Sequence, residues 1–354
     1  MTSSLDGLTV VGVVVTYGQR YELCRIAVEG ALRSGVDRVV VVCNGTPNTS
    51  TLLRETRWPP GTLIELVDLP ENSGSAGGFR RGIEAALLGT SDALWLLDDD
   101  SDIDSKALVA LRTAVAQSTG RYFAFASLRA SIVNQVKVVN GTRSAPDVGS
   151  FMHFDIGRYF HSKPPAEQGR YIEVPNAPYG GLLISRSLVE RIGLPMEELY
   201  LYEDDTEYTA RIPAMGAQIL LCRDSVIRDA DAKWINSAVS TSGPEAASTS
   251  GPERLLRADD ETRLYYAVRN RSWLDIQRNR RHPTVRFCLS FIVFNVYLTL
   301  QAVRTRRWRN YRLYLRALRD GVAGRLGVMS TQALKSARES SAEQPDSEGG
   351  NRGA

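Results

Sequence analysis

Cysteine and histidine are both scarce in this chain. Its 354 residues include four cysteines and three histidines. No two cysteines form a CxxC pair, and Cys43 and Cys222 lie inside apolar runs. The spacing therefore predicts neither a disulfide framework nor a zinc site.

Two common phosphate-binding signatures are also missing. The glycine-rich segment 71–82, ENSGSAGGFRRG, matches neither G-x-G-x-x-G nor the P-loop pattern. This excludes a Rossmann dehydrogenase and a P-loop nucleotidase. The start of the chain, MTSSLDGLTV, lacks the basic residues and apolar stretch of a signal peptide, so we expect the protein in the cytoplasm.

The net charge is only +3, but it is unevenly distributed. Residues 284–325 hold nine arginines and a single acidic residue, Asp320, while the rest of the chain is mildly acidic. A basic segment of this kind predicts an anionic partner, either a membrane surface or nucleic acid.

The apolar run 287–303, FCLSFIVFNVYLTLQAV, adjoins these arginines and favours the membrane, because nucleic acid cannot satisfy it. As a helix, these 17 residues would be about 25 Å long, shorter than the ~30 Å hydrocarbon core of a bilayer. We therefore expect a helix lying in the membrane interface and no nucleic-acid partner. A core helix, or a dimer helix in a homo-oligomer, is the alternative.

Strand and helix patterns alternate through the first hundred residues. Apolar runs predict strands at 8–17, 37–45, 62–70 and 92–100, and helical spacing predicts helices at 19–35 and near 78–89. Such alternation predicts an α/β fold with a mostly parallel central sheet flanked by helices. Polar residues follow the strand ends, where open α/β sheets bind ligands.

Changes in composition divide the chain into four parts. We expect a catalytic domain over 1–235 and a flexible loop or lid over 236–262, which is rich in Ser, Gly, Pro and Ala. A basic, helical, membrane-associated region should follow over 263–330. The polar segment 331–354 should be a disordered tail.

Three consecutive aspartates end the apolar run WLLDDD. Asp98 and Asp100 should point to one side of the strand, with Asp99 turned the other way. Hard divalent cations prefer carboxylate oxygens, so Asp98 and Asp100 are candidate ligands of Mn2+ or Mg2+. A capping role for the downstream acids Asp102 or Asp104 is compatible with this.

The glycine-rich segment precedes the aspartates by about 20 residues and opens a helix. Its glycines let backbone N–H groups approach a phosphate, and Arg80 adds positive charge; a tight turn is the alternative. A second acidic cluster, EDDTE at 203–207, precedes another helix. It either caps that helix or contains a general base.

Seven segments occur in a characteristic order: VVVTY, VVVVCNG, ENSGSAGGFRRGIEAA, WLLDDDS, YGGLLISRSLVERIG, YEDDTEYTAR and YYAVRNRSWL. As an ordered set, covering roughly residues 8–275, they resemble the family 2 inverting glycosyltransferases with the GT-A fold. Within that family the chain looks most like the bacterial galactofuranosyltransferases, and rhamnosyltransferases are close relatives.

The resemblance implies roles for individual residues. Asp205 would be the base that deprotonates the acceptor hydroxyl, supported by Asp204, Glu207 and Arg211. Asp98 and Asp100 would hold the metal ion on the donor diphosphate. The positions implied to face the sugar nucleotide are Thr16, Tyr17, Asn44, Asn72, Gly74, Gly77, Gly78 and Asp99.

One departure concerns a metal-binding histidine that this family often has after the next strand. Here Asp229 stands in its place, and it becomes the third predicted metal ligand. The resemblance implies transfer of galactofuranose from UDP-galactofuranose to a polyprenyl-diphosphate-linked glycan at the cytoplasmic face of the membrane. The alternatives are a dTDP-rhamnose donor and a non-catalytic sugar-nucleotide-binding protein.

Overall fold

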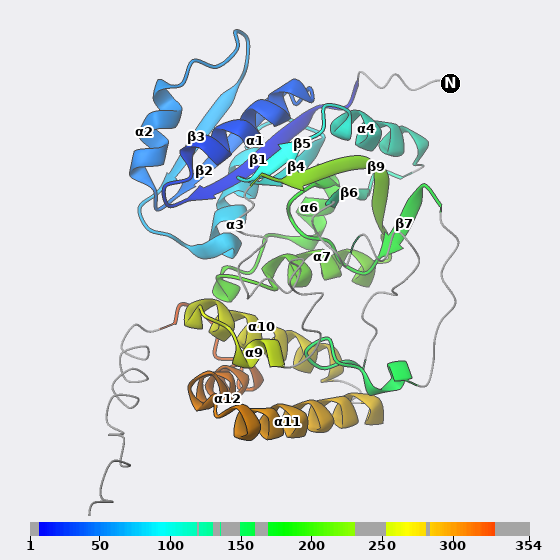
Figure 1. Ribbon diagram of the computed structural model, residues 1–354. Helices are drawn as coiled ribbons and strands as arrows, with labels where there is room; N and C mark the ends of the chain where they lie inside the picture. The colour runs from blue at the N-terminus through cyan, green and yellow to red at the C-terminus, as the bar shows by residue number, and fades with distance from the viewer. Residues whose placement is uncertain are drawn as a thin grey trace, which may run out of the picture.

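The computed structural model describes residues 7–118, 120–129, 135, 149–159, 169–230, 253–280 and 284–329. Its centre is a nine-stranded sheet in the order β3-β2-β1-β4-β8-β6-β9-β5, with β7 paired to β9 (Figure 1). The strands are β1 (Val10–Tyr17), β2 (Arg38–Asn44), β3 (Ile64–Leu69), β4 (Ala93–Asp98), β5 (Ser101–Ile103), β6 (Ala124–Arg129), β7 (Tyr171–Val174), β8 (Leu182–Ser185) and β9 (Ile219–Asp229).

The α/β class with a central sheet and flanking helices is confirmed, but the sheet is mixed. β1 to β4 pair in parallel, as the alternating pattern predicts, and β6 is parallel to β9. β8 runs antiparallel to both β4 and β6, and β5 and β7 run antiparallel to β9. The parallel prediction therefore holds for β1 to β4 but not for β5, β7 and β8.

Helices cover both faces of the sheet. The first layer comprises α1 (Tyr21–Arg33), α2 (Pro47–Glu55) and α4 (Ala107–Gln117), and the second comprises α3 (Gly74–Leu87), α6 (Arg186–Ile192) and α7 (Asp204–Ala214). Alternate residues of β1 enter the two cores, with Val14 on the first side and Val13 on the second. This two-sided burial explains the continuous apolar runs of the strands.

A helical unit made by the C-terminal part of the chain lies below the second layer (Figure 1). It contains α9 (Glu253–Leu256), α10 (Glu261–Asn279), α11 (Val285–Thr305) and α12 (Trp308–Val322), and it has its own apolar core. The short helix η2 (Ile156–Tyr159) packs against α11, and η3 (Glu197–Leu199) packs against α3. Residues 236–252 of the predicted lid and 331–354 of the predicted tail lie outside the described residues.

α11 is longer than the apolar run that predicted it. Its 21 residues give it the length and composition to cross a membrane. One side of the helix, which includes Phe287, Phe294 and Leu298, is buried in the core of the helical unit. The opposite side is apolar and exposed, and it includes Ile292, Val296 and Leu300.

Candidate active site

The aspartates after β4 tie that strand to its neighbour β1. The hydroxyl of Thr16 donates to Asp99 Oδ2 at 2.8 Å, and Arg20 Nε donates to the same oxygen at 2.9 Å. Arg20 Nη2 also reaches Asp100 Oδ2 at 3.1 Å. Thr16 and Asp99, both predicted to face the donor, are therefore buried partners of each other. Tyr17 is half-buried beneath the guanidinium of Arg20.

Asp98 and Asp229 are joined by a residue that the sequence analysis did not select, Arg129 at the end of β6. Its Nη1 binds Asp98 Oδ2 at 2.5 Å, and its Nη2 binds Asp229 Oδ1. A Cβ at Gly180 would lie 2.4 Å from Asp98 Oδ2 and 2.6 Å from Arg129 Nη1. Position 180 therefore has to be glycine for this pair to form as it does.

The predicted ligands Asp98, Asp100 and Asp229 do not fit a divalent cation in this arrangement. The guanidinium of Arg129 lies between two of them. Within the described part of the chain, no group of three or more His, Cys, Asp or Glu side chains is placed to hold a metal ion. Burial and then the charge of Asp98 raise the pKa of Asp100 to about 7. The negative charge here is thus countered by arginines.

Asn44 holds the glycine-rich loop against the end of β2. Its Nδ2 donates to Gly74 O at 2.8 Å and to Asn72 Oδ1 at 3.3 Å, while its Oδ1 accepts from Ser73 N at 2.8 Å. Asn72 Oδ1 in turn accepts from Gly74 N at 2.8 Å. Both asparagines, predicted to line the donor site, are engaged in shaping this loop.

The glycines of this segment serve close packing. α3 begins at Gly74, four residues before the predicted helix. A Cβ at Gly77 would lie 2.5 Å from Ser73, and one at Gly78 would lie 2.5 Å from Val15 Cγ1. Arg80 is turned toward Glu84 and Glu197, with Nε to oxygen distances of 3.2 and 3.8 Å. Its charge is therefore partly countered by these two acids.

The second acidic cluster forms the N-terminus of α7, where the sequence placed it. Asp204 is buried and accepts a hydrogen bond from Ser75 Oγ at 2.8 Å, which connects α7 to the first turn of α3. Burial and then the charge of Asp205 raise the pKa of Asp204 well above its usual range. Asp204 is therefore a buried, structural partner of the glycine-rich loop.

Asp205 is half-buried and accepts from the backbone N–H of Thr206 at 2.6 Å and from its hydroxyl at 3.2 Å. Burial, and then the charge of Glu203, raise the pKa of Asp205 to about 7. The charge of Asp98 adds to this shift, so the two acidic clusters act on each other across the same end of the sheet. A carboxyl group with this pKa is suited to general base catalysis near neutral pH.

The carboxylate of Glu207 is engaged by Arg211 of the same helix. Its two oxygens bind Arg211 Nε at 2.9 Å and Nη2 at 2.6 Å. Arg211 Nη1 donates to the carbonyls of Ile192 and Leu194 at 3.1 and 2.9 Å. The pair thus anchors α7 to the end of α6.

No protein-family model and no curated protein matches this sequence. Several solved structures resemble it at low identity. A crystal structure of GalNAc-T7 with UDP, GalNAc and Mn2+ has a TM-score of 0.47 and 13% identity, over 63% of this chain and 44% of that one. S. aureus TarS 1-349 in complex with UDP-GlcNAc has a TM-score of 0.43 and 12% identity, over 89% of this chain and 91% of that one.

A nucleotidyl transferase from Methanothermobacter thermautotroptrophicus also matches, with a TM-score of 0.38 and 12% identity, over 62% of this chain and 88% of that one. The chain spans less than half the length of the GalNAc-T7 chain that it matches.

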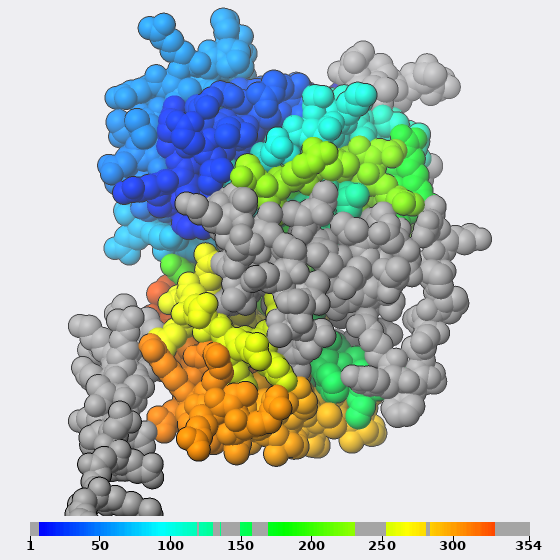
Figure 2. Space-filling view, in the orientation of Figure 1, coloured from blue at the N-terminus to red at the C-terminus, as the bar shows by residue number. Residues whose placement is uncertain are grey.

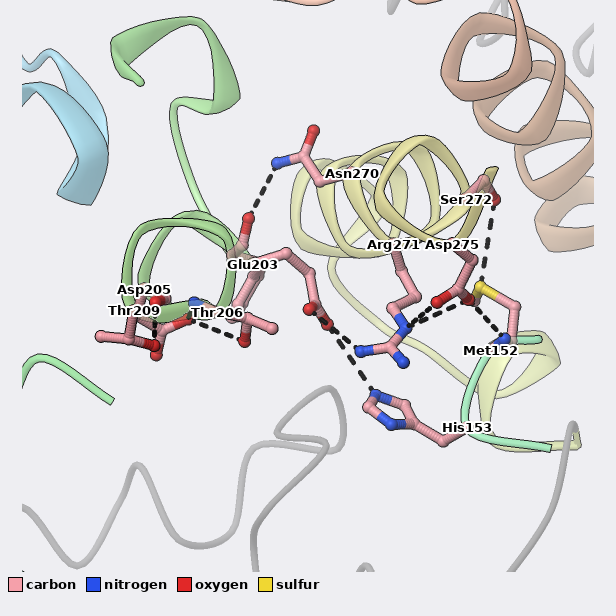
Figure 3. A network of polar contacts seen from close by, with 11 residues as sticks. Met152, His153, Glu203, Asp205, Thr206, Thr209, Asn270, Arg271, Ser272 and Asp275 are labelled. Carbon is pink, nitrogen blue, oxygen red and sulfur yellow. Dashed lines mark hydrogen bonds and ion pairs between the residues drawn. The ribbon is translucent and has the colours of Figure 1, made fainter. Parts of the chain in front are cut away.

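The sequence analysis missed the residues that hold these elements together. Arg20 and Arg129 neutralise the aspartates, and Asn270 and Arg271 of α10 lie behind the second acidic cluster (Figure 3). A usable signal was present in YYAVRNRSWL, where four consecutive polar residues stand between two apolar stretches. Polar side chains that are fully buried in a helix require partners on another element.

Proposed function

We propose that this protein is an inverting glycosyltransferase in which Asp205 is the general base. Asp205 would take the proton of an acceptor hydroxyl while the hydroxyl oxygen attacks the anomeric carbon in line. The bond from that carbon to the diphosphate oxygen breaks, and the nucleoside diphosphate leaves with the electron pair. One bond forms and one breaks, so the configuration inverts without a covalent intermediate.

The observation that carries this proposal is the position of Asp205. It lies at the N-terminus of α7, next to the glycine-rich loop, and it is close enough to Asp98 for the two charges to interact. Its pKa of about 7 leaves a large fraction ionised at neutral pH while keeping the group basic enough to accept a proton. The resemblance of the ordered motifs to family 2 glycosyltransferases supports the same assignment.

The donor we propose is UDP-galactofuranose, with dTDP-rhamnose as the alternative within the same reaction. This choice rests on the resemblance of NSGSAGGF and WLLDDD to the galactofuranosyltransferases. Mn2+ or Mg2+ at Asp98, Asp100 and Asp229 remains a prediction. An ion there would first have to displace Arg129 from two carboxylates.

The acceptor we propose is a lipid-linked glycan at the cytoplasmic face of the membrane. The exposed side of α11 supports this, because it presents apolar residues over the length of the helix. α11 lies along the lower edge of the molecule (Figure 2), and it contacts the arginine-rich α12. Because one side of α11 is buried against the protein, we favour a helix that lies on the membrane surface over one that spans the membrane.

The test is transfer and donor hydrolysis by Asp205→Asn, with UDP- and dTDP-sugars as donors, with and without Mn2+. We expect the variant to lose transfer by about 100-fold or more, as is typical for removal of a general base. It should still bind the nucleotide, because the amide oxygen can accept from Thr206. Glu207→Gln is a related control: it weakens the pair with Arg211 and should mainly lower stability. Near-normal turnover by Asp205→Asn would contradict the proposal.

A second candidate is a non-catalytic sugar-nucleotide-binding protein. The observation that favours it is Arg129, which occupies the place of a cation between Asp98 and Asp229. The same assay separates the two. Saturable binding of a nucleotide sugar by the wild-type protein, without turnover on any donor, would support the binding protein.

A further inference from the structure

The segment that leads into α7 has an unusual backbone. Tyr200, Tyr202 and Glu203 all have a positive φ, with values of 62°, 66° and 62°. This conformation costs a residue with a side chain about 1–2 kcal/mol. Three such residues persist only when the surrounding structure holds them in place. Because the segment ends directly before Asp204, it determines where the N-terminus of α7 lies.

The residues that hold this segment come from α10. Asn270 Nδ2 lies 2.7, 2.8 and 2.9 Å from the carbonyl oxygens of Leu199, Leu201 and Tyr202. Asn270 is fully buried. Arg269 Nη2 adds a hydrogen bond of 3.1 Å to Leu199 O. The segment is thus fixed by a helix that lies some 70 residues further along the chain.

The next residue of α10, Arg271, binds the side chain of Glu203. Arg271 Nη1 is 3.2 Å from Glu203 Oε2, and its Nε is 3.1 Å from Asp275 Oδ1 (Figure 3). On the other side of Glu203, His153 Nε2 is 3.8 Å from Oε1. Burial alone would raise the pKa of Glu203, but Arg271 and His153 outweigh it and lower this pKa to about 2. Glu203 therefore stays ionised.

We propose that Glu203 and Arg271 are positioning residues that set the charge felt by Asp205, and with it the pH range of transfer. The inference rests on the proposed function, since it requires Asp205 to be the base. Glu203 lies two residues before Asp205, and its negative charge is fixed there by Arg271. The pair thus links the catalytic group to the C-terminal helical unit.

Several groups face Asp205 and have to be included in its titration. They are Glu203 and Asp204 from its own segment, Asp98 from the end of β4, Tyr179 from the loop before β8, and, behind Glu203, His153, Arg271 and Arg278. The charge of Arg271, and then burial, lower the pKa of His153. Of these groups, Glu203 and Arg271 form a direct ion pair and can be changed without touching Asp205.

The two members of the pair act on Asp205 with opposite signs. Removing the negative charge of Glu203 takes away a repulsion that raises the pKa of Asp205, so this pKa should fall. Removing the positive charge of Arg271 leaves the acids uncompensated, so the pKa should rise. A purely structural role would lower the activity of both variants without moving the pH profile in opposite directions.

The experiment is the pH dependence of kcat/KM for the wild type, Glu203→Gln, Arg271→Met and the double variant. The acidic limb should move down by about one pH unit in Glu203→Gln and up in Arg271→Met. The double variant should lie between them, close to the wild type. Arg271→Lys keeps the charge and should keep the wild-type limb. Glu22→Gln removes the same charge from an exposed pair with Arg25 and should change nothing.

Melting temperatures identify variants that fail to fold, and Glu203→Gln tests the inference even if Arg271→Met does not fold. An unmoved acidic limb in folded Glu203→Gln, or shifts of the same sign in both variants, would overturn the inference. Its failure is distinguishable from failure of the proposed function. If only the inference fails, Asp205→Asn is inactive but the acidic limb does not move in Glu203→Gln. If the proposed function fails, Asp205→Asn is active.

Discussion

Asp205 keeps its proton through a pH range in which an exposed aspartate is ionised. Its pKa of about 7 in the folded protein compares with about 4 in an unfolded chain. Between these values the folded state binds the extra proton, so the free energy of unfolding falls as the pH rises toward 7. The same carboxyl group can act as a base only above this range.

Two measurements follow from this titration. The kcat/KM of the wild type should fall tenfold for each pH unit below about 7, because only ionised Asp205 accepts a proton.

Asp205→Asn should melt a few degrees above the wild type at pH 8, where Asp205 of the wild type is charged, and at nearly the same temperature near pH 4. A flat kcat/KM profile between pH 5 and 8 would contradict the assigned pKa.

Arg129 gives a prediction about metal binding. Arg129→Gln removes the positive charge that lies between Asp98 and Asp229, so it should raise the affinity for Mn2+ by about tenfold. Electron paramagnetic resonance of free Mn2+ measures this without any turnover. Arg25→Gln, in an exposed pair, is the control. Unchanged or weaker Mn2+ binding would show that Arg129 does not compete with the ion.

Single residues were predictable from the sequence where the side chain is an acid at the end of a strand or at the start of a helix. The positions of Asp98 and Asp205 follow from the motifs in which they occur. Their arginine partners were not predictable, because Arg20, Arg129 and Arg271 approach from other elements. Which arginine meets which carboxylate depends on tertiary packing, and no local pattern records it.

Among the elements, α3 packs closely against the sheet at Gly78. A Cβ at position 78 would lie 2.5 Å from Val15 Cγ1 and 3.2 Å from Asn44 Nδ2. We expect Gly78→Ala to lower the free energy of unfolding by about 1–3 kcal/mol, since the helix has to move away from β1. Chemical denaturation measures this loss.

Gly120→Ala is the matched control, because its added Cβ would be no closer than 3.7 Å to Tyr122 O. Equal stability of the two variants would show that α3 has room to move. If Gly78→Ala stays folded but loses transfer activity, the shape of the glycine-rich loop limits the reaction.

Elements were predictable where the pattern is local. The strands β1 to β4 and the helix α1 agree with their sequence patterns to within about two residues at each end. The direction of β8 was not predictable, because an apolar run of four residues fits a parallel or an antiparallel neighbour equally well. The start of α3 was also missed, since glycines argue against a helix unless close packing requires them.

For the whole molecule, the exposed side of α11 predicts how the protein meets a membrane. Ile292 and Leu300 are 53% and 62% exposed. Ile292→Asp and Leu300→Asp should each weaken binding to anionic vesicles by more than about tenfold, because each places a charge where an apolar side chain would be buried. Co-sedimentation with vesicles measures this.

Leu88→Asp is the control, since Leu88 is 87% exposed at the end of α3, away from α11. Vesicle binding that is equal in all three variants would contradict the membrane surface. A wild-type dimer that both α11 variants convert to a monomer would instead identify this side as an interface between two copies of the chain.

The hydrogen bonds from Asn270 to residues 199–202 have a consequence for truncation. A fragment that ends near residue 235 keeps every position predicted to take part in catalysis or to bind the sugar nucleotide. It lacks the Asn270 amide, which donates hydrogen bonds to these three carbonyl oxygens. We therefore expect such a fragment to lose the positive-φ segment that leads into α7. During synthesis, the proposed base Asp205 would reach its working position only after the ribosome has released α10.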